Sequence, residues 1–193
     1  MRDTRQSPLH RRRFLSLAAV GSLALCLPGT PAPAQIKSVP RSLGQVTRRV
    51  VAYRGNSAPG TIEISNAQRL LHFVLGQGAA AEYDISVGRD GFLWTGTTIV
   101  GRKAKWPDWR PPAEMRKRQP DLPAHVPPGP YNPLGARAIY LYSGGRDTLY
   151  RIHGTNNAAT IGGFETSGCF RMSNADVLEL YERVTPGAQV IVT

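Results

Sequence analysis

Short segments rich in β-branched and aromatic residues dominate the chain from residue 45 onward, and they limit the fold more than any other feature. Helical periodicity is scarce there, and glycine-containing turns such as residues 76–78 and 88–91 separate the segments. We expect strands at residues 45–53, 61–65, 69–75, 81–87 and 96–100. Short strands at about ten-residue spacing predict a mainly antiparallel domain of the β-sandwich or barrel-like type.

The last third of the chain adds a hairpin, one helix and a closing strand. Residues 136–142 and 148–153 are expected to pair through the turn at residues 143–147. The run from Ser173 to Asp176 is typical of a helix-capping box, and the apolar stripe after it predicts a helix that ends before Pro186. Residues 190–192 form a last strand. The predicted fold class is mainly β with mixed sheets and one packed helix near the C-terminus.

The first 34 residues have the three-part layout of a secretory signal, with arginines before an apolar run and a small-x-small site that ends at Ala34. Residues 11–15 resemble the twin-arginine motif. The apolar run, residues 14–27, is shorter than the roughly 20 residues that a membrane-spanning helix needs. We therefore expect residues 1–34 to be a cleaved signal peptide, with no stable membrane span afterwards and a periplasmic or cell-envelope location.

The remaining chain has the length of one domain, with residues 35–44 as a linker and residues 45–193 as the domain itself. The whole sequence carries a formal net charge of +11. Because the leader holds five arginines and one aspartate, the mature part would carry +7. This net positive charge reflects either solvent-exposed arginines without a function or an electrostatic field that suits a polyanionic substrate of the cell envelope.

Residues 105–135 differ from the rest of the domain, since they combine many prolines with two tryptophans and a basic cluster. Neither strand nor helix is expected there. Long irregular loops in small domains are often functional, so we interpret this excursion as one wall of a site that includes Trp109, or else as a surface decoration. Basic and aromatic residues also mix in this way in grooves for single-stranded nucleic acid. Export argues against a nucleic-acid partner.

Cys169 is the one cysteine outside the leader, so it has no partner within the mature chain for a disulfide. It is therefore either inert and buried or reactive. A reactive thiol needs a nearby imidazole, and His153 at a predicted strand end is a stronger candidate than His72 or His125.

The turn before the sulfur offers donors for an oxyanion. Backbone amides of Ser167, Gly168 and Cys169 lie next to one another, and Gly168 permits a sharp turn with close approach of a carbonyl. Arg171 has the fork geometry to bind a carboxylate, although a structural ion pair would explain it equally well. One cysteine and three scattered histidines give no metal-ligand spacing, so neither a metal nor a cofactor is expected.

Residues 153–156 (His-Gly-Thr-Asn), 167–172 (Ser-Gly-Cys-Phe-Arg-Met) and Asp176 resemble the signature of the L,D-transpeptidase catalytic domain, also called the YkuD domain. The likeness extends over residues 61–193. Many members of that family carry a basic residue directly before the Gly-Cys pair, where this chain has Ser167. Phe170 stands where Ile or Val is usual, which changes only packing.

The resemblance implies an enzyme in which Cys169 attacks a peptidoglycan tetrapeptide stem and releases the terminal D-alanine. In the family's Cys-His-Gly triad, His153 would be the base and the Gly154 carbonyl would orient it. The resulting thioester, which a carbapenem would trap in this family, passes to an amine of a second stem or of an envelope protein. The product is a 3-3 cross-link or a wall-anchored protein. Arg171, Thr155, Asn156 and Trp109 would contact the substrate.

Two alternatives stay open at this point. The first is an L,D-carboxypeptidase or other hydrolase with the same Cys169 and His153 chemistry, in which water replaces the acceptor amine. The second is a non-catalytic wall-binding module that uses the basic surface and the tryptophans of the excursion while Cys169 only packs.

Overall fold

The computed structural model describes residues 44–193. The predicted signal peptide, its cleavage at Ala34, the twin-arginine resemblance and all but the last residue of the predicted linker lie outside this range. Within the described part, no helix is long and apolar enough to cross a membrane.

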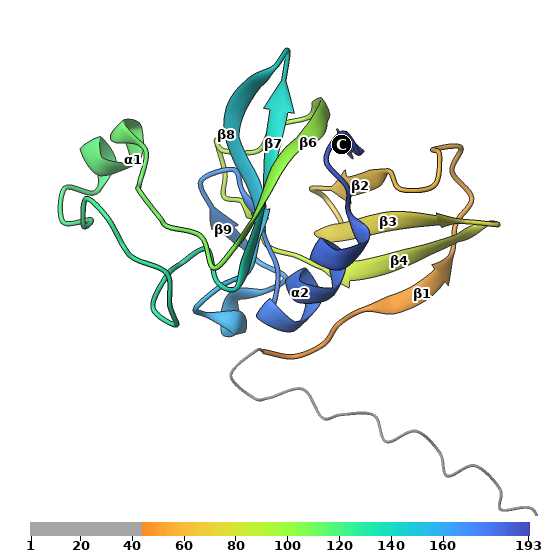
Figure 1. Cartoon of the computed structure of the whole chain (residues 1–193), viewed down its shortest axis with the longest axis horizontal. Helices are drawn as coiled ribbons and strands as arrows, with labels where there is room; N and C mark the ends of the chain where they lie inside the picture. The colour runs from red at the N-terminus through yellow and green to blue at the C-terminus, as the bar shows by residue number, and fades with distance from the viewer. Residues whose placement is uncertain (1–43) are drawn as a thin grey trace, which may run out of the picture. The chain divides into compact units, whose positions relative to one another are not determined.

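A nine-stranded mixed sheet forms most of the domain (Figure 1). Its order is β1 (Arg49–Ala52), β4 (Ala79–Asp84), β3 (Leu70–Gly76), β2 (Ile62–Ser65), β11 (Gln189–Val192), β6 (Gly96–Lys105), β7 (Arg137–Ser143), β8 (Arg146–His153) and β10 (Phe170–Arg171). The β11–β2 and β10–β8 pairs are parallel and the others antiparallel. A parallel ribbon of β5 (Val87–Gly88) and β9 (Phe164–Thr166) completes the strands.

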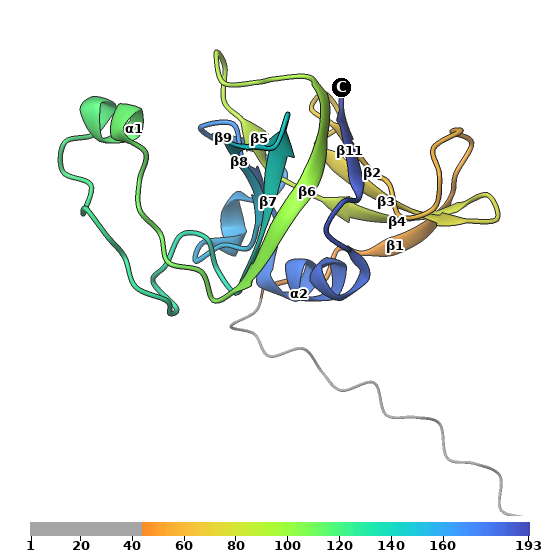
Figure 2. The ribbon, with the colours of Figure 1, turned by 45° about the horizontal axis from the view of Figure 1, so that its top comes forward.

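The C-terminal strand joins the two halves of the sheet, because β11 lies between β2 and β6. Figures 1 and 2 show β1 to β4 running across the direction of β6, β7 and β8, so the sheet wraps around a common core. Fully buried side chains from both halves, such as Ile62, Leu71, Leu141 and Ile152, pack in one cluster. The prediction of a mainly β fold with mixed strand directions and a packed helix is thus confirmed. The two parallel pairs form because β11 and β10 each join the sheet beside strands distant in sequence.

The packed helix is α2 (Asn174–Arg183). Its N-cap is Ser173, whose Oγ accepts a hydrogen bond from the Asp176 backbone N–H at 3.0 Å, as the capping pattern predicts. Val177 and Leu180 are fully buried in the core. The helix begins five residues after Cys169 and packs on the sheet, which anchors the chain that follows the cysteine-containing turn.

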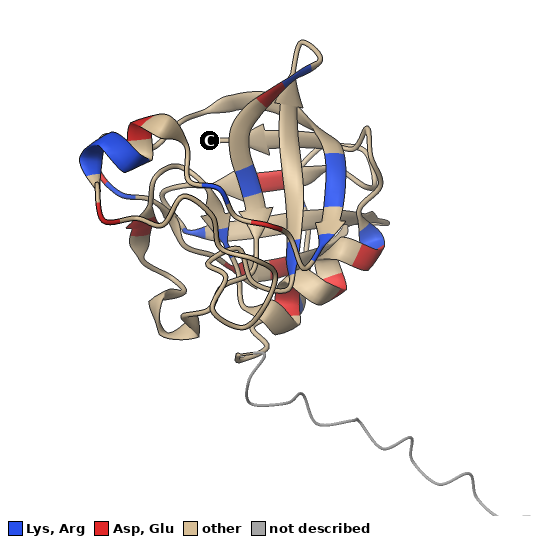
Figure 3. Ribbon diagram, turned by 60° about the vertical axis from the view of Figure 1, so that its left-hand side comes forward, with Lys and Arg blue, Asp and Glu red and all other residues tan. Residues whose placement is uncertain are grey.

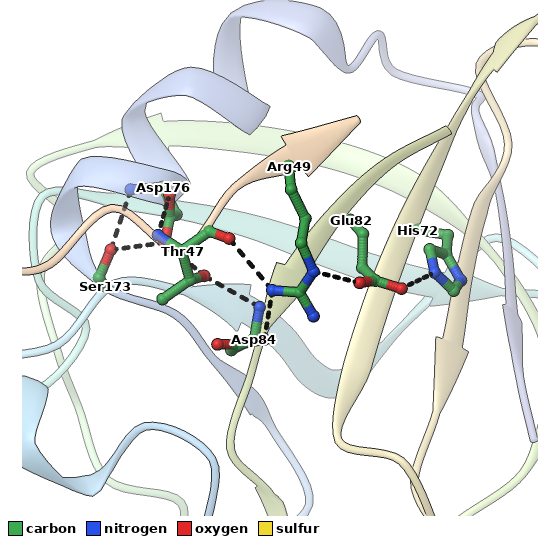
Figure 4. Close-up of polar contacts among 7 residues, drawn as sticks. All are labelled: Thr47, Arg49, His72, Glu82, Asp84, Ser173 and Asp176. Carbon is green, nitrogen blue, oxygen red and sulfur yellow. Dashed lines mark hydrogen bonds and ion pairs between the residues drawn. The ribbon is translucent and has the colours of Figure 1, made fainter. Parts of the chain in front are cut away.

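A chain of polar contacts fastens the first described residues to β4 and α2 (Figure 4). Thr47 donates its backbone N–H and hydroxyl to Asp176, each at 3.0 Å. Arg49 pairs with Glu82 at 2.6 Å, and Glu82 in turn accepts from His72 at 2.6 Å. His72 is thus a satisfied structural histidine, which is the interpretation that its apolar strand favoured.

The proline-rich excursion corrects one expectation. Strand β6 continues to Lys105, and a six-residue helix, α1 (Ala113–Arg118), follows Pro112. Residues 113–118 contain no proline, and Pro112 directly before them has a φ that suits the start of a helix. A short helix therefore forms within an otherwise irregular loop. The buried Asn132 holds the loop closed by donating to carbonyls of Pro107, Val126 and Pro127 at 2.9–3.1 Å.

Candidate active site

Strands β8 and β10 bring the predicted nucleophile and base together. They pair in parallel with Phe170 opposite Ile152 and Arg171 opposite His153. Side chains alternate along a strand, and Ile152 and Phe170 face the core. His153 and Cys169, each one position from these core residues, therefore lie on the opposite face of the sheet. Continued by one residue, the register sets Cys169 opposite Arg151, two positions before His153 in β8, so the two residues occupy neighbouring positions on that face.

That face forms one wall of a cavity of about 1010 Å³. Cys169, His153 and Arg171 line it, as do Trp106 and Trp109 from the excursion. The long loop is thus part of the wall of this cavity, as the sequence interpretation proposed. Cys169 itself is partly exposed, so the sulfur has a route of approach.

His153 is buried and held in a single tautomer. Its Nδ1–H donates to the Gly154 carbonyl at 2.6 Å, which leaves Nε2 as the acceptor nitrogen. Burial, reinforced by the charge of Arg171, lowers the pKa of His153 to about 3. The imidazole is therefore neutral at ordinary pH, which is the form a general base requires.

The Cys169 thiol is also neutral at rest. It donates to the Leu149 carbonyl at 3.8 Å, and burial raises the pKa of the thiol although the Arg151 charge opposes this. Leu149 has a positive φ of 64° at a bulge of β8, an unusual conformation for leucine that directs this carbonyl toward the sulfur. With both partners neutral, the proton must leave the sulfur as the sulfur attacks.

The predicted oxyanion donors need a correction at Gly168. Its N–H donates to Thr166 Oγ1 at 3.1 Å, because the Thr166 side chain folds back into the turn and also donates to the Cys169 carbonyl. The Ser167 and Cys169 N–H groups have no acceptor among residues 44–193. These two amides are the ones available to a developing oxyanion.

The four predicted substrate contacts divide into two pairs. Arg171 and Trp109 line the cavity, whereas Thr155 and Asn156 do not. Thr155 is buried and its hydroxyl accepts from the Asn157 N–H, while Asn156 donates to the Tyr131 carbonyl at 3.0 Å. The structure therefore does not place these two residues with Cys169 on the cavity wall.

Arg171 is well placed for a carboxylate. Its Nη1 donates to Thr160 at 2.8 Å, and its buried Nε has no partner among the described residues. No carboxylate in the described range pairs with it within 4 Å. The buried Nε is out of reach of a ligand, but Nη2 has no hydrogen-bond partner among the described residues, so Arg171 keeps a donor group for one.

Asn174 is a positioning residue that the sequence analysis treated only as part of the helix cap. Its Oδ1 accepts the N–H groups of Ala136 (2.9 Å) and Thr155 (3.1 Å), and its Nδ2 donates to the Thr155 carbonyl (2.7 Å). A Cβ on Gly154 would lie 2.2 Å from Oδ1. Glycine at this position lets Asn174 approach and fix the peptide that orients His153.

We expect Gly154→Ala to destabilise the fold by about 1–3 kcal/mol through this clash and to slow acylation of Cys169 at least tenfold by displacing the Gly154 carbonyl. Denaturant unfolding and the rate of carbapenem adduct formation measure the two effects. Because the clash is with Asn174, combining the change with Asn174→Ala will cost less than the sum of the two single variants. Strict additivity in a double-mutant cycle would contradict this arrangement.

Among residues 44–193, no three histidine, cysteine, aspartate or glutamate side chains lie together as a metal site. His125, for example, pairs with Asp108 on the excursion at 2.9 Å. The fold and the site together define a β-rich domain whose chemistry centres on a cysteine–histidine pair.

Comparison with known proteins places this domain. The sequence profile of YkuD, the L,D-transpeptidase catalytic domain, matches residues 59–192. The probable L,D-transpeptidase YbiS of Escherichia coli K12 is 38% identical over 139 residues, which cover 68% of this chain and 43% of that protein. The chain therefore belongs to the L,D-transpeptidase catalytic domain family, and it spans less than half the length of the curated relatives that it matches first.

Solved structures agree on the fold. An L,D-transpeptidase from Enterococcus faecium is similar with a TM-score of 0.55 at 17% identity, over 70% of this chain and 50% of that one. A Brucella melitensis protein described as a probable carnitine operon oxidoreductase is 42% identical, with a TM-score of 0.52 over 76% of this chain and 92% of that one. The profile match and the curated relatives show that the chain belongs to the family, and the solved structures show the fold.

Proposed function

We propose that this protein is a peptidoglycan L,D-transpeptidase with Cys169 as nucleophile and His153 as general base. The observation that supports the proposal is that Cys169 and His153 line the same cavity, the cysteine partly exposed and the imidazole fixed through Nδ1 by the Gly154 carbonyl. The donor would be a tetrapeptide stem of the cell wall.

The first half-reaction follows from the protonation states. His153 Nε2 takes the thiol proton while sulfur bonds to the carbonyl carbon of the diamino acid. The carbonyl oxygen becomes an oxyanion that the Ser167 and Cys169 amides stabilise. The carbon–nitrogen bond then breaks, the imidazolium returns the proton to the departing D-alanine amine, and a thioester remains on Cys169. Because burial and Arg171 disfavour the imidazolium, the proton is transferred promptly to the leaving group.

The second half-reaction reverses these roles. An acceptor amine, from a neighbouring stem or from an envelope protein, loses its proton to His153 and attacks the thioester. Sulfur departs and regains the proton. Water in place of the amine would make the enzyme an L,D-carboxypeptidase, which is the second candidate. Residues of the excursion line the cavity, and exclusion of water there would favour transfer over hydrolysis.

Incubation with purified tetrapeptide-bearing wall fragments tests the proposal. We expect cross-linked dimers with release of one D-alanine per dimer, measured by mass spectrometry. Tripeptide products alone would establish hydrolysis. Binding to wall fragments without any product or adduct would establish the wall-binding module.

The substrate requires a location outside the cytoplasm, so we also propose that residues 1–34 act as a twin-arginine-type signal peptide and that the domain works in the periplasm. The sequence pattern of the leader supports this placement. Cell fractionation, with the protein found only in the cytoplasm as the contrary result, is the direct measurement.

A further inference from the structure

The cavity is basic overall, because seven cationic side chains line it against three carboxylates, those of Asp108, Glu114 and Glu165. Six cationic side chains that line it have no carboxylate within 4 Å among residues 44–193: Arg89, Arg102, Lys105, Arg110, Arg118 and Arg171. Arg151 is the cavity-lining cation with such a partner, Asp147 at 2.8 Å. Figure 3 shows the basic residues gathered on α1 and on the strands behind it. This excess of unpaired positive charge favours an anionic ligand.

Two of these arginines converge on one aromatic ring. The Arg89 guanidinium carbon lies 4.5 Å from the centroid of the Phe92 ring, and that of Arg118 lies 4.9 Å from the same centroid. Arg89 and Phe92 belong to the turn after β5, whereas Arg118 is the last residue of α1. Both guanidinium groups therefore contact one ring, although they come from segments that are distant in the sequence.

This cluster lies at the Gly168 end of the nucleophile segment. The Arg89 N–H donates to the Thr166 carbonyl at 3.0 Å, and the Phe92 carbonyl would lie 3.2 Å from a Cβ on Gly168. Arg171 follows Cys169 at the other end, in β10. The turn that holds Arg89 and Phe92 therefore contacts the residues just before Cys169, and Arg171 lies just after it.

We propose that Arg89 and Arg118, held by Phe92, form an anion subsite for a non-terminal carboxylate of a stem peptide. A carboxylate that reaches both guanidinium groups would offset the repulsion between their charges and accept charge-assisted hydrogen bonds from them. Arg171 then receives a different carboxylate next to the reacting bond. The inference rests on the proposed function, since it takes the stem peptide as the substrate of this cavity.

The test compares Arg118→Ala with Arg116→Ala. Both residues belong to α1 and carry the same charge, but Arg116 does not line the cavity. The substrates are a tetrapeptide stem with all carboxylates free and the same stem with each non-terminal carboxylate amidated in turn. Because Arg118 is exposed, we expect Arg118→Ala to raise KM for the free stem by about three- to tenfold, with kcat changed less than twofold. For one of the amidated stems, the wild type and Arg118→Ala should have the same KM, because the carboxylate that Arg118 binds is then absent.

Arg118→Lys keeps the positive charge but lacks the two-pronged guanidinium group. Its KM for the free stem should therefore lie between the values of the wild type and Arg118→Ala. Separate measurement of acylation and of transfer from a preformed thioester assigns the carboxylate to the donor or the acceptor stem. An equal KM change in Arg116→Ala, or a change in Arg118→Ala that no amidation removes, would overturn the subsite. If wild type converts no stem at all, the proposed function itself fails. Calorimetric binding of the free and amidated stems to Cys169→Ala then judges the subsite alone: tighter binding of the free stem that Arg118→Ala removes supports it, and equal affinities overturn it.

Discussion

Cys169→Ala will lose all carbapenem adduct formation and all conversion of tetrapeptide stems, because no other group on the cavity wall can form the thioester. Intact-mass spectrometry should show one added carbapenem on the wild-type chain and none on the variant. The side chain is partly exposed and makes one long contact, to the Leu149 carbonyl at 3.8 Å. The free energy of unfolding should therefore change by less than about 1 kcal/mol.

A matched control is Ser143→Ala, at the exposed last residue of β7, which should acylate like the wild type. Product formation retained in the folded Cys169→Ala protein would refute the assignment of the nucleophile. Loss of folding in that variant would instead show that the thiol has a structural role that its exposure does not suggest.

His153→Gln is expected to slow acylation by about 10²–10⁴-fold, the usual contribution of a positioned general base. Stopped-flow measurement with a carbapenem separates this step from transfer. In the wild type, the pKa of His153 is lowered to about 3 by burial, so the acylation rate should not fall as pH drops through 6.5. A fall centred near pH 6.5 in the wild type would show that the resting imidazole is exposed and titrates normally.

The same pKa shift makes the stability of the wild-type protein depend on pH, and His153→Gln tests this as well. An unfolded histidine has a pKa near 6.5, so below that pH the unfolded chain binds a proton that the folded chain does not. The contribution of the neutral His153 to the wild-type free energy of unfolding should therefore be complete above pH 6.5 and decrease progressively toward pH 3. His153→Gln should lack this component of the pH dependence.

Local sequence patterns were sufficient to predict most secondary structure. The alternating segments became β2, β3, β4 and the β7–β8 hairpin, and the capping pattern at Ser173 became α2. These features depend on neighbours within a few residues, so a single sequence reveals them. The helix α1 was missed, because the proline-rich composition of residues 105–135 concealed six consecutive proline-free residues.

The candidate site shows a similar division. Cys169, His153 and Arg171 were identifiable from residue chemistry and family resemblance, and all three line one cavity. Thr155 and Asn156 were predicted to contact the substrate, but the structure does not place them on the wall of that cavity. Asn174 was not recognised as a positioning residue, because its partners lie 19 and 38 positions away in the chain. No local pattern reports such contacts.

The sequence by itself therefore determined the kind of chemistry available, a lone thiol with an imidazole and an arginine two residues after the thiol, and the strand-rich character of the domain. Only the tertiary structure decided which groups are accessible and in which protonation state. Parallel pairing of β8 with β10 sets the sulfur and the imidazole on one face, and burial keeps both neutral. The physical reason is that register, burial and charge proximity arise from segments far apart in the chain, which meet only when the sheet closes around its core.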